Sequence, residues 1–314
     1  MKKYLVGLGL LLSGFALTAC GTAENGQTAE KGQLQAIATF YPMYEFTKEV
    51  IGDEGTVELL IPAGTEPHDY EPSAKDVAKI SQADAFVYNS EEMETWVESI
   101  EDSLDEEKTL VIEAADQIDL LEMTDDGHDH DHEEEDHDHD HDKDPHVWTD
   151  PIMAIKEVET IRDELSEKFP DKKAAFEKNA AAYIEKLQKL DQDFTDAFAN
   201  ATNKTFVTQH AAFGYLANQY GLTQESIAGI SPDQEPSPSR LAELKHFVED
   251  HGVKVIYFEE NASSKVAETL SKETGVKLAV LNPVESLTKQ QMEDGKTYLS
   301  IMQENLEALK ESIN

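Results

Sequence analysis

Histidines carry the clearest chemistry in this sequence, and their spacing separates them into three groups. The chain has 11 histidines. Six alternate with Asp and Glu in one short run, two are His246 and His251, and three stand far apart as His68, His146 and His210. Neutral imidazole is a good ligand for Zn²⁺ and related transition metals. The histidines therefore predict metal binding, and the setting of each group indicates which one holds the ion.

The three scattered histidines share one setting. His68 and His210 each follow an expected strand, and His146 precedes the first of two long expected helices. In a parallel α/β sheet, the ligand cleft lies outside the carboxyl ends of the strands. One histidine there is more often structural than a ligand, but three that arrive from both halves of the chain predict one metal site. The helix expected at 211–220 should also disfavour protonation of His210 and keep its lone pair available.

A carboxylate would complete such a site, and the second half of the chain offers two candidates. Glu285 and the pair Glu259–Glu260 each follow an expected strand. Glu285 is preferred because it follows the last strand of its half. Glu259 and Glu260 could equally be an acidic pair that caps a helix.

The other eight histidines are expected to lie outside the tight site. His246 and His251 fall on an expected surface helix or at its end, where they would be solvated. The remaining six lie in an acidic run that has nothing to bury and is expected to be a mobile loop. Its internal position argues against a tag, and its imidazoles and carboxylates would collect Zn²⁺ weakly beside the cleft. These accessory positions are His128, His130, His132, His137, His139 and His141.

The charge balance excludes some classes of partner. The chain has 65 Asp and Glu against 26 Lys and Arg, a formal net charge of −39. Residues 125–145 alone hold twelve acidic residues and one lysine, hence −11. Such a charge disfavours nucleic acid and anionic lipid surfaces as partners and suits a cationic ligand. Cys20 is the only cysteine, so the mature domain has neither disulfides nor thiolate metal sites.

The N-terminus has the features of an export signal. Two lysines precede an apolar run that is too short to span a membrane, and the run ends in Leu17-Thr18-Ala19-Cys20. This pattern resembles a bacterial lipoprotein signal, in which Cys20 is lipidated. An ordinary secretory signal with an incidental cysteine is the alternative. We expect residues 1–19 to be the signal peptide and residues 20–33 to be a lipidated tether.

Short apolar runs alternate with amphipathic segments in both halves of the chain, as expected for buried parallel strands joined by helices. The expected strands are 34–40, 57–61, 85–88, 109–114, 205–208, 222–227, 253–258 and 277–281. The expected helices are 43–51, 74–81, 93–104, 152–168, 171–200, 211–220, 238–251, 263–274 and 297–313.

The fold class that follows is α/β with two pseudo-symmetric lobes, each a mostly parallel sheet flanked by helices. The N-terminal lobe is expected at 34–170 and includes the acidic loop at 125–145. A long rigid helix at 171–200 links it to the C-terminal lobe at 201–314, because that segment contains no Gly or Pro. A ligand would lie in the cleft between the lobes.

Three segments carry a resemblance to a known family. They are Pro-His-Asp-Tyr-Glu-Pro around His68, Asp-Pro-His-Val-Trp-Thr-Asp-Pro around His146, and Gln-His-Ala-Ala-Phe-Gly-Tyr at His210. Together with the His/Asp-rich insertion, they resemble the zinc-uptake lipoproteins of ABC transporters, of the ZnuA and AdcA type. The resemblance covers essentially the whole mature chain. It implies one Zn²⁺ held by His68, His146, His210 and a fourth group.

The same resemblance sets expectations for function. Glu285 matches the acidic ligand of Gram-positive members, whereas some relatives leave the fourth position to water. Manganese-specific relatives replace one histidine by a carboxylate, so three histidines favour zinc. The implied function is capture of Zn²⁺ as a transported ligand and its delivery to an ABC permease and its ATPase. The protein would be a monomer on the extracytoplasmic face of a Gram-positive cell membrane, held by its lipid anchor, without a nucleic-acid partner.

Two alternatives from other classes are less favoured. A zinc hydrolase would need an open metal position and a general base, and the sequence has no His-Glu-x-x-His signature. The protein is therefore expected not to be an enzyme. A surface adhesin is a further alternative, as is a manganese-binding homologue, but no repeat or aromatic-rich patch supports adhesion as the main role.

Overall fold

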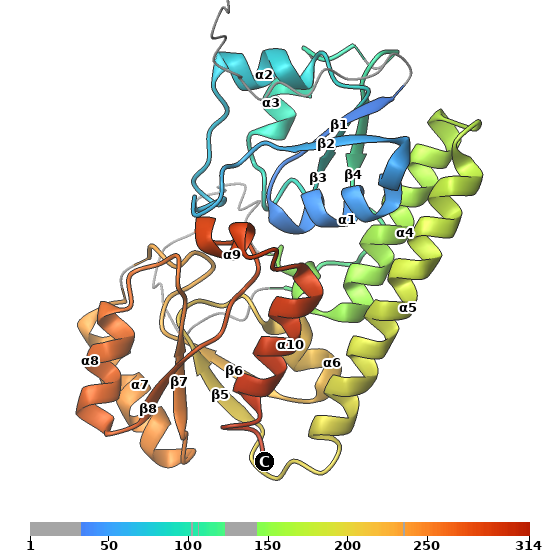
Figure 1. The fold of residues 1–314 in the computed structure, drawn as a ribbon. Coiled ribbons are helices and arrows are strands. Elements are labelled where there is room, and N and C mark those ends of the chain that lie inside the picture. The colour runs from blue at the N-terminus through green and yellow to red at the C-terminus, as the bar shows by residue number, and fades with distance from the viewer. Residues whose placement is uncertain (1–32, 102, 106, 123–142, 235) are drawn as a thin grey trace, which may run out of the picture. The chain divides into compact units, whose positions relative to one another are not determined.

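The computed structural model describes residues 33–314 except residues 102, 106, 123–142 and 235 (Figure 1). The expected signal peptide, Cys20 and most of the tether lie outside the described residues, as do the six histidines of the acidic run. Residues 32–314 form one compact unit. Within it lie two separate four-stranded sheets, one built from each half of the chain.

The first sheet is entirely parallel, with the strand order β2-β1-β3-β4. Its strands are β1 (Leu34–Ala38), β2 (Gly55–Leu59), β3 (Ala85–Tyr88) and β4 (Leu110–Glu113). Its helices are α1 (Tyr41–Ile51), the 3₁₀ turn η1 (Gly52–Glu54), α2 (Ala74–Ile80) and α3 (Val97–Glu101). The strand order reverses between β1 and β3, and ligands of open α/β sheets bind outside the carboxyl ends of strands at such a point.

The second sheet repeats this plan with the order β6-β5-β7-β8, again all parallel. Its strands are β5 (Thr205–Thr208), β6 (Thr223–Ser226), β7 (Val255–Phe258) and β8 (Lys277–Val280). Its helices are α6 (Gly214–Tyr220), α7 (Pro238–Asp250), α8 (Lys265–Thr274), α9 (Lys289–Glu293) and α10 (Tyr298–Leu309). The two equivalent parallel sheets confirm the predicted α/β fold with two halves of the same topology.

Two long helices connect the halves. The 3₁₀ turn η2 (Val147–Thr149) leads into α4 (Pro151–Lys168), which packs along α5 (Lys173–Phe198) (Figure 1). The 26 residues of α5 span about 39 Å at 1.5 Å per residue. Along that length α5 contacts α1 in the first half and both α6 and α10 in the second. The predicted linking helix is therefore present, with slightly narrower bounds.

The hydrophobic core runs through both halves without interruption. One buried cluster includes side chains from β1, α1, α4, α5, α6 and α10. Each sheet carries a second, smaller cluster on its other face. In β1, for example, Ala38 faces the shared core and Ile37 faces the smaller cluster. Strands buried on both faces have no polar side, which explains why they read as continuous apolar runs.

The structure differs from the expected elements in short helices. The helix expected at 93–104 is reduced to α3, which begins at Val97 after a turn. The short helix α9 was not expected, although its start has a capping box in which Thr288 and Gln291 satisfy each other's backbone N–H groups. Five residues are too few to show a helical period, so only the cap could have revealed it.

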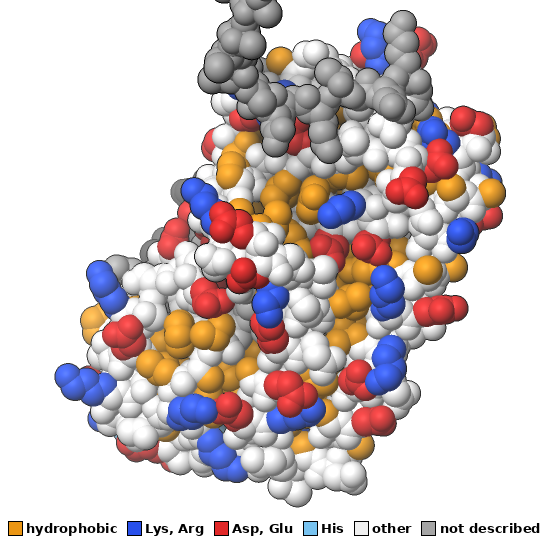
Figure 2. Space-filling model, viewed as in Figure 1, with side chains coloured by type: hydrophobic (Ala, Val, Ile, Leu, Met, Phe, Trp, Pro, Cys, Tyr) orange, Lys and Arg blue, Asp and Glu red, His pale blue; other side chains and the backbone are white. Residues whose placement is uncertain are grey.

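Charged side chains of both signs are interspersed on the face shown in Figure 2. The acidity of the described residues therefore forms no single patch on that face. In the part of the chain that the structure describes, no helix is both long and apolar enough to cross a membrane.

One side chain conflicts with the apolar core. Glu157 of α4 is fully buried, and neither of its carboxyl oxygens has a hydrogen-bond partner among the described residues. Burial raises the pKa of this carboxyl well above its usual value, and nearby Glu94 raises it further. The folded protein thus holds this proton more tightly than the unfolded chain. The stabilisation that depends on this proton is fully present below the pKa that Glu157 has in the unfolded chain. It is lost as the pH rises through the higher pKa that Glu157 has in the folded protein.

Replacing Glu157 by leucine is expected to raise the free energy of unfolding at pH 8 by about 1–3 kcal/mol, the usual cost of an unsatisfied buried polar group. The gain should shrink towards pH 5, where wild-type Glu157 keeps its proton at no electrostatic cost. Urea denaturation at both pH values measures the difference. Glu167→Leu, at an exposed position of the same helix, is the control and should show no such pH-dependent gain. A Glu157→Leu variant that is less stable at pH 8 would contradict this account.

Candidate metal centre

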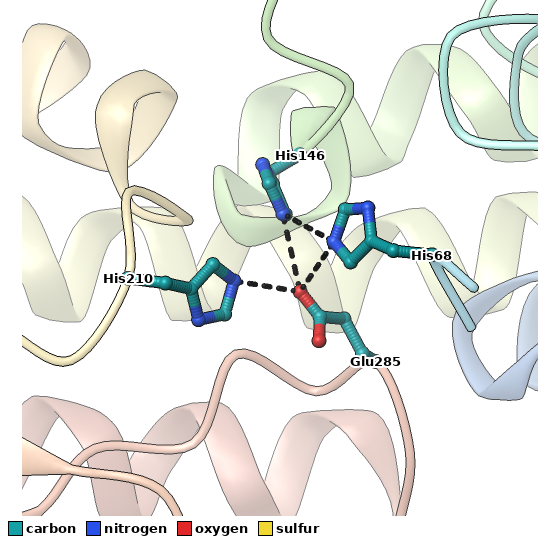
Figure 3. Close-up of side chains that lie close together, drawn as sticks. All are labelled: His68, His146, His210 and Glu285. Atoms are coloured by element: carbon teal, nitrogen blue, oxygen red, sulfur yellow. Dashed lines mark hydrogen bonds and ion pairs between the residues drawn. The ribbon is translucent and has the colours of Figure 1, made fainter. Parts of the chain in front are cut away.

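Four side chains from distant parts of the chain converge on one point (Figure 3). His68 comes from the loop after β2, His146 from the turn before η2, His210 from the end of β5, and Glu285 from the loop after β8. One ligand atom from each lies within 4.8 Å of all the others. The structure thus brings together the three scattered histidines and the preferred carboxylate, while their role as metal ligands stays a prediction.

Glu285 lies at the middle of this group. Its Oε1 is 3.0 Å from Nε2 of His210, 3.1 Å from Nε2 of His146 and 3.5 Å from Nε2 of His68. The Nε2 atoms of His68 and His146 are 3.2 Å apart. All three rings therefore present the same nitrogen to one place, which gives a donor set of three imidazole nitrogens and one carboxylate oxygen. That set and number are the ones Zn²⁺ takes in tetrahedral protein sites.

The centre is shielded from solvent. The side chains of His146 and His210 are 0% exposed, that of Glu285 is 5% exposed and that of His68 is 9% exposed. Buried ionisable groups are costly unless they are paired or ligate an ion. Here the cost is offset by the pairing of Glu285 with the imidazoles. His68 is the most accessible member of the group.

Two carboxylates outside the group contact the Nδ1 atoms of two of the rings, on the side opposite to Nε2. Asp144 Oδ1 is 2.7 Å from Nδ1 of His146, and Glu259 Oε1 is 2.6 Å from Nδ1 of His210. Such partners keep the proton on Nδ1 and aim the Nε2 lone pair at a metal. Glu259 therefore lies beside the centre as an orienting partner. Glu260, its alternative in the sequence, is exposed and accepts a hydrogen bond from Gln291.

The expectation that His210 would resist protonation is wrong. Burial lowers the pKa of this imidazole, but the charges of Glu259 and Glu285 and their hydrogen bonds outweigh burial and hold it well above its usual value. The expected cause is also absent, because α6 begins at Gly214 instead of directly after His210. Burial likewise opposes protonation of His146, yet hydrogen bonds to Asp144 and Glu285 raise its pKa.

His68 and Glu285 shift in the opposite direction. Burial lowers the pKa of His68, and its hydrogen bond to Glu285 offsets this only in part. Burial would raise the pKa of Glu285, but the charge of His210 and the hydrogen bonds from the three histidines hold it well below its usual value. The carboxylate is therefore ionised, as a metal ligand must be.

The backbone before Glu285 is held in an unusual conformation. Val284 has a φ of 64° and is the one non-glycine residue with positive φ in the described part of the chain. A β-branched residue there is strained by about 1–3 kcal/mol. The conformation is held from both sides: the N–H of Val284 donates to Asn282 Oδ1 at 2.7 Å, and Trp148 Nε1 donates to the carbonyl of Pro283 at 2.7 Å. The sequence did not predict this support, since Trp148 is 135 positions away from Pro283 in the chain.

His246 and His251 lie on α7 and at its C-terminal cap, and both are exposed. The prediction that they are solvated is confirmed.

Comparisons with known proteins identify zinc-uptake and zinc-binding proteins as relatives of this chain. Residues 37–312 match the ZnuA family, described as "Zinc-uptake complex component A periplasmic". The chain is 55% identical over 315 residues to the zinc-binding lipoprotein AdcA of Streptococcus pneumoniae, which covers 99% of this chain and 61% of AdcA. It is 51% identical over 316 residues to the high-affinity zinc uptake system protein ZnuA of Bacillus subtilis, which covers 100% of this chain and 99% of that protein.

A solved structure shows the same fold. The crystal structure of the Zn(II)-bound ZnuA-like domain of Streptococcus pneumoniae AdcA is similar with a TM-score of 0.77 and 55% sequence identity. The match covers 90% of this chain and 99% of that one. The chain spans less than two thirds of full-length AdcA, at 61%. Because the family match extends over nearly all of the described residues, the protein belongs to the ZnuA family of zinc-uptake proteins.

Proposed function

We propose that this protein captures Zn²⁺ outside the cytoplasm and delivers it to an ABC permease, which its ATPase drives. The observation that carries the proposal is the convergence of His68, His146, His210 and Glu285 within 4.8 Å. The names of the relatives support it, because they describe zinc-binding and zinc-uptake proteins.

The donor set favours zinc over manganese. Imidazole is a preferred ligand for zinc, whereas manganese is better served by carboxylate, carbonyl and water oxygens. Three nitrogens and one oxygen also fill a tetrahedral set from protein groups alone. A catalytic zinc instead keeps a position open for water. The arrangement therefore supports a carrier that holds a metal ion as cargo, and we propose that the protein is not an enzyme.

We propose the cellular placement from the sequence. Residues 1–19 would be removed as a signal peptide, and a lipid on Cys20 would anchor a monomer through residues 20–33 to the outer face of a Gram-positive membrane. AdcA of Streptococcus pneumoniae is named a lipoprotein, which supports this placement. Lobes at 34–170 and 201–314 with a linker at 171–200 are supported by α5, which contacts helices of both halves.

The acidic histidine run would serve as an accessory collector of zinc. The run lies outside the described residues, but the residues that flank it are described. Glu122 and Lys143 pair as a short antiparallel bridge. Lys143 stands three residues before His146 in the sequence, so the described end of the run is near a proposed ligand, which supports this role.

The direct test is elemental analysis of the purified protein, followed by competition between Zn²⁺ and Mn²⁺. We expect about one tightly held zinc per chain and displacement of bound manganese by zinc, since imidazole ligands prefer zinc. Chelator competition gives the affinity of each metal separately. Tight manganese binding with weak zinc binding would overturn the proposal, as would a purified protein that takes up neither metal.

A further inference from the structure

Tyr215 occupies an unexplained position beside the metal centre. It lies on α6 and is 4% exposed. Its hydroxyl donates to the backbone carbonyl of Asp144 at 2.6 Å and accepts from the backbone N–H of Leu121 at 2.8 Å. One hydroxyl group from the second half of the chain thus joins two backbone segments of the first half.

Those two backbone segments form a neck, which we define as residues 121, 122, 143 and 144. Its two sides are hydrogen-bonded to each other, because the N–H of Asp144 donates to the carbonyl of Leu121 at 2.8 Å. Glu122 and Lys143 continue the pairing as an antiparallel bridge. Tyr215 adds a third connection across the neck. The main chain of Asp144 is therefore fixed to α6 as well as to Leu121.

The side chain of Asp144 is what orients His146. Its Oδ1 accepts from the backbone N–H of His146 at 2.9 Å and lies 2.7 Å from Nδ1 of the ring. A carboxylate in this position fixes the tautomer and the direction of the Nε2 lone pair. The direction of His146 thus depends on where the Asp144 backbone is held.

The residue before Tyr215 gives an independent indication. A Cβ atom added to Gly214 would lie 2.6 Å from Oδ2 of Asp144, a distance that real Cβ contacts do not show. Gly214 therefore leaves room for the carboxylate, and Tyr215 holds the backbone of the same residue. Two neighbouring positions of the Phe-Gly-Tyr segment serve Asp144 in different ways.

We propose that Tyr215 is a positioning residue of the metal centre, acting through Asp144 on His146. The inference rests on the proposed function, since it concerns how tightly zinc is held. Tyr215→Phe keeps the ring in the core and removes only the hydroxyl group. We expect its zinc dissociation constant to rise several-fold, and by no more than the roughly 10–100-fold that loss of the outer-sphere partner Asp144 itself would cost. Tyr220→Phe is the matched control, because it removes a hydroxyl of the same helix that bonds to Asp191 instead; it should bind zinc like wild type.

A double-mutant cycle separates positioning from general structural support. If Tyr215 acts through Asp144, the double variant Tyr215→Phe/Asp144→Asn should bind zinc within about twofold of Asp144→Asn alone. Effects that multiply independently would overturn the proposal. In the zinc-loaded protein, the Nδ1 proton of His146 should exchange with solvent faster in Tyr215→Phe than in wild type or Tyr220→Phe, as observed by NMR. An unchanged exchange rate would also overturn it.

Gly214→Ala is a second route to the same conclusion, because its methyl group displaces the carboxylate without touching the hydroxyl. It should weaken zinc binding in the same direction, and wild-type affinity would count against the role of Asp144. Failure of the inference is distinct from failure of the proposed function. If His210→Ala abolishes tight zinc binding but Tyr215→Phe leaves it intact, only the inference fails. If wild-type protein holds no zinc, the proposed function itself fails.

Discussion

Replacing His210 by alanine is expected to lower the zinc affinity of this protein by more than about a hundredfold. Loss of an outer-sphere partner already costs about 10–100-fold, and His210 would contribute a coordinating nitrogen itself. The variant would lose more than this one ligand nitrogen. Glu259 and Glu285 lie 2.6 Å and 3.0 Å from the ring nitrogens, and both carboxylates would lose that buried partner. Chelator competition at fixed pH measures the change.

His68→Ala and His146→Ala should weaken binding in the same way, because each supplies an Nε2 atom to the same point. The matched control is His246→Ala, which removes an exposed histidine of α7 and should leave affinity unchanged. Circular dichroism shows whether each variant is folded. If the variants of His68, His146 and His210 all fold and bind zinc like wild type, the assignment of the site is contradicted. The acidic histidine run would then be the candidate for tight zinc binding.

The architecture could be predicted from local patterns because its elements are long or strongly apolar. Strands such as β3 and β5 are found at the expected residues. Short elements such as α3 and α9 could not be bounded, since fewer than two turns carry no usable period. The hydrophobic core that the two halves share could not be predicted either, because contacts between the halves depend on tertiary packing.

The site also contains some residues that the sequence could predict and others that it could not. Three histidines at strand or helix ends are a local signal, and the topology of parallel sheets brings such ends together. The residues that orient them could not be assigned that role from the sequence: Glu259 follows an expected strand but could also be a ligand or a helix cap, and Tyr215 carries no local signal. Glu259 reaches His210 across 49 positions of sequence, and Tyr215 reaches Asp144 across 71. The contact between Glu259 and His210 becomes predictable only when the strand order is known, because that order places β5 beside β7. The raised pKa of His210 follows from this contact with Glu259, which the sequence did not predict.

The protonation of the centre follows from its geometry. Both ring nitrogens of His210 face carboxylate oxygens, Glu259 at 2.6 Å and Glu285 at 3.0 Å. Those of His146 face Asp144 at 2.7 Å and Glu285 at 3.1 Å. An ionised carboxylate only accepts hydrogen bonds, so in the metal-free centre a ring nitrogen that hydrogen-bonds to one of these carboxylates carries a proton. The raised pKa values of both rings have this same cause.

Zinc must displace the Nε2 protons of His146 and His210, because a metal ligand uses the lone pair that the proton occupies. Both pKa values are raised, so protons compete with zinc up to a higher pH than they would at an ordinary histidine. Competition weakens as pH rises, and it ends above the raised pKa values. Zinc affinity should therefore increase with pH, by up to about a hundredfold per unit if two protons leave, at tenfold for each.

Chelator competition between pH 6 and pH 8 tests this slope, and calorimetry in two buffers of different ionisation enthalpy counts the protons released. Glu259→Gln is an informative variant, because it removes the carboxylate that holds Nδ1 of His210 and should lower the pKa of that ring. Its pH slope should be shallower than that of wild type, even though its zinc affinity is also reduced. A wild-type affinity that does not change over this range, with no buffer dependence of the heat, would contradict this account, because it would show that the rings of His146 and His210 are already neutral.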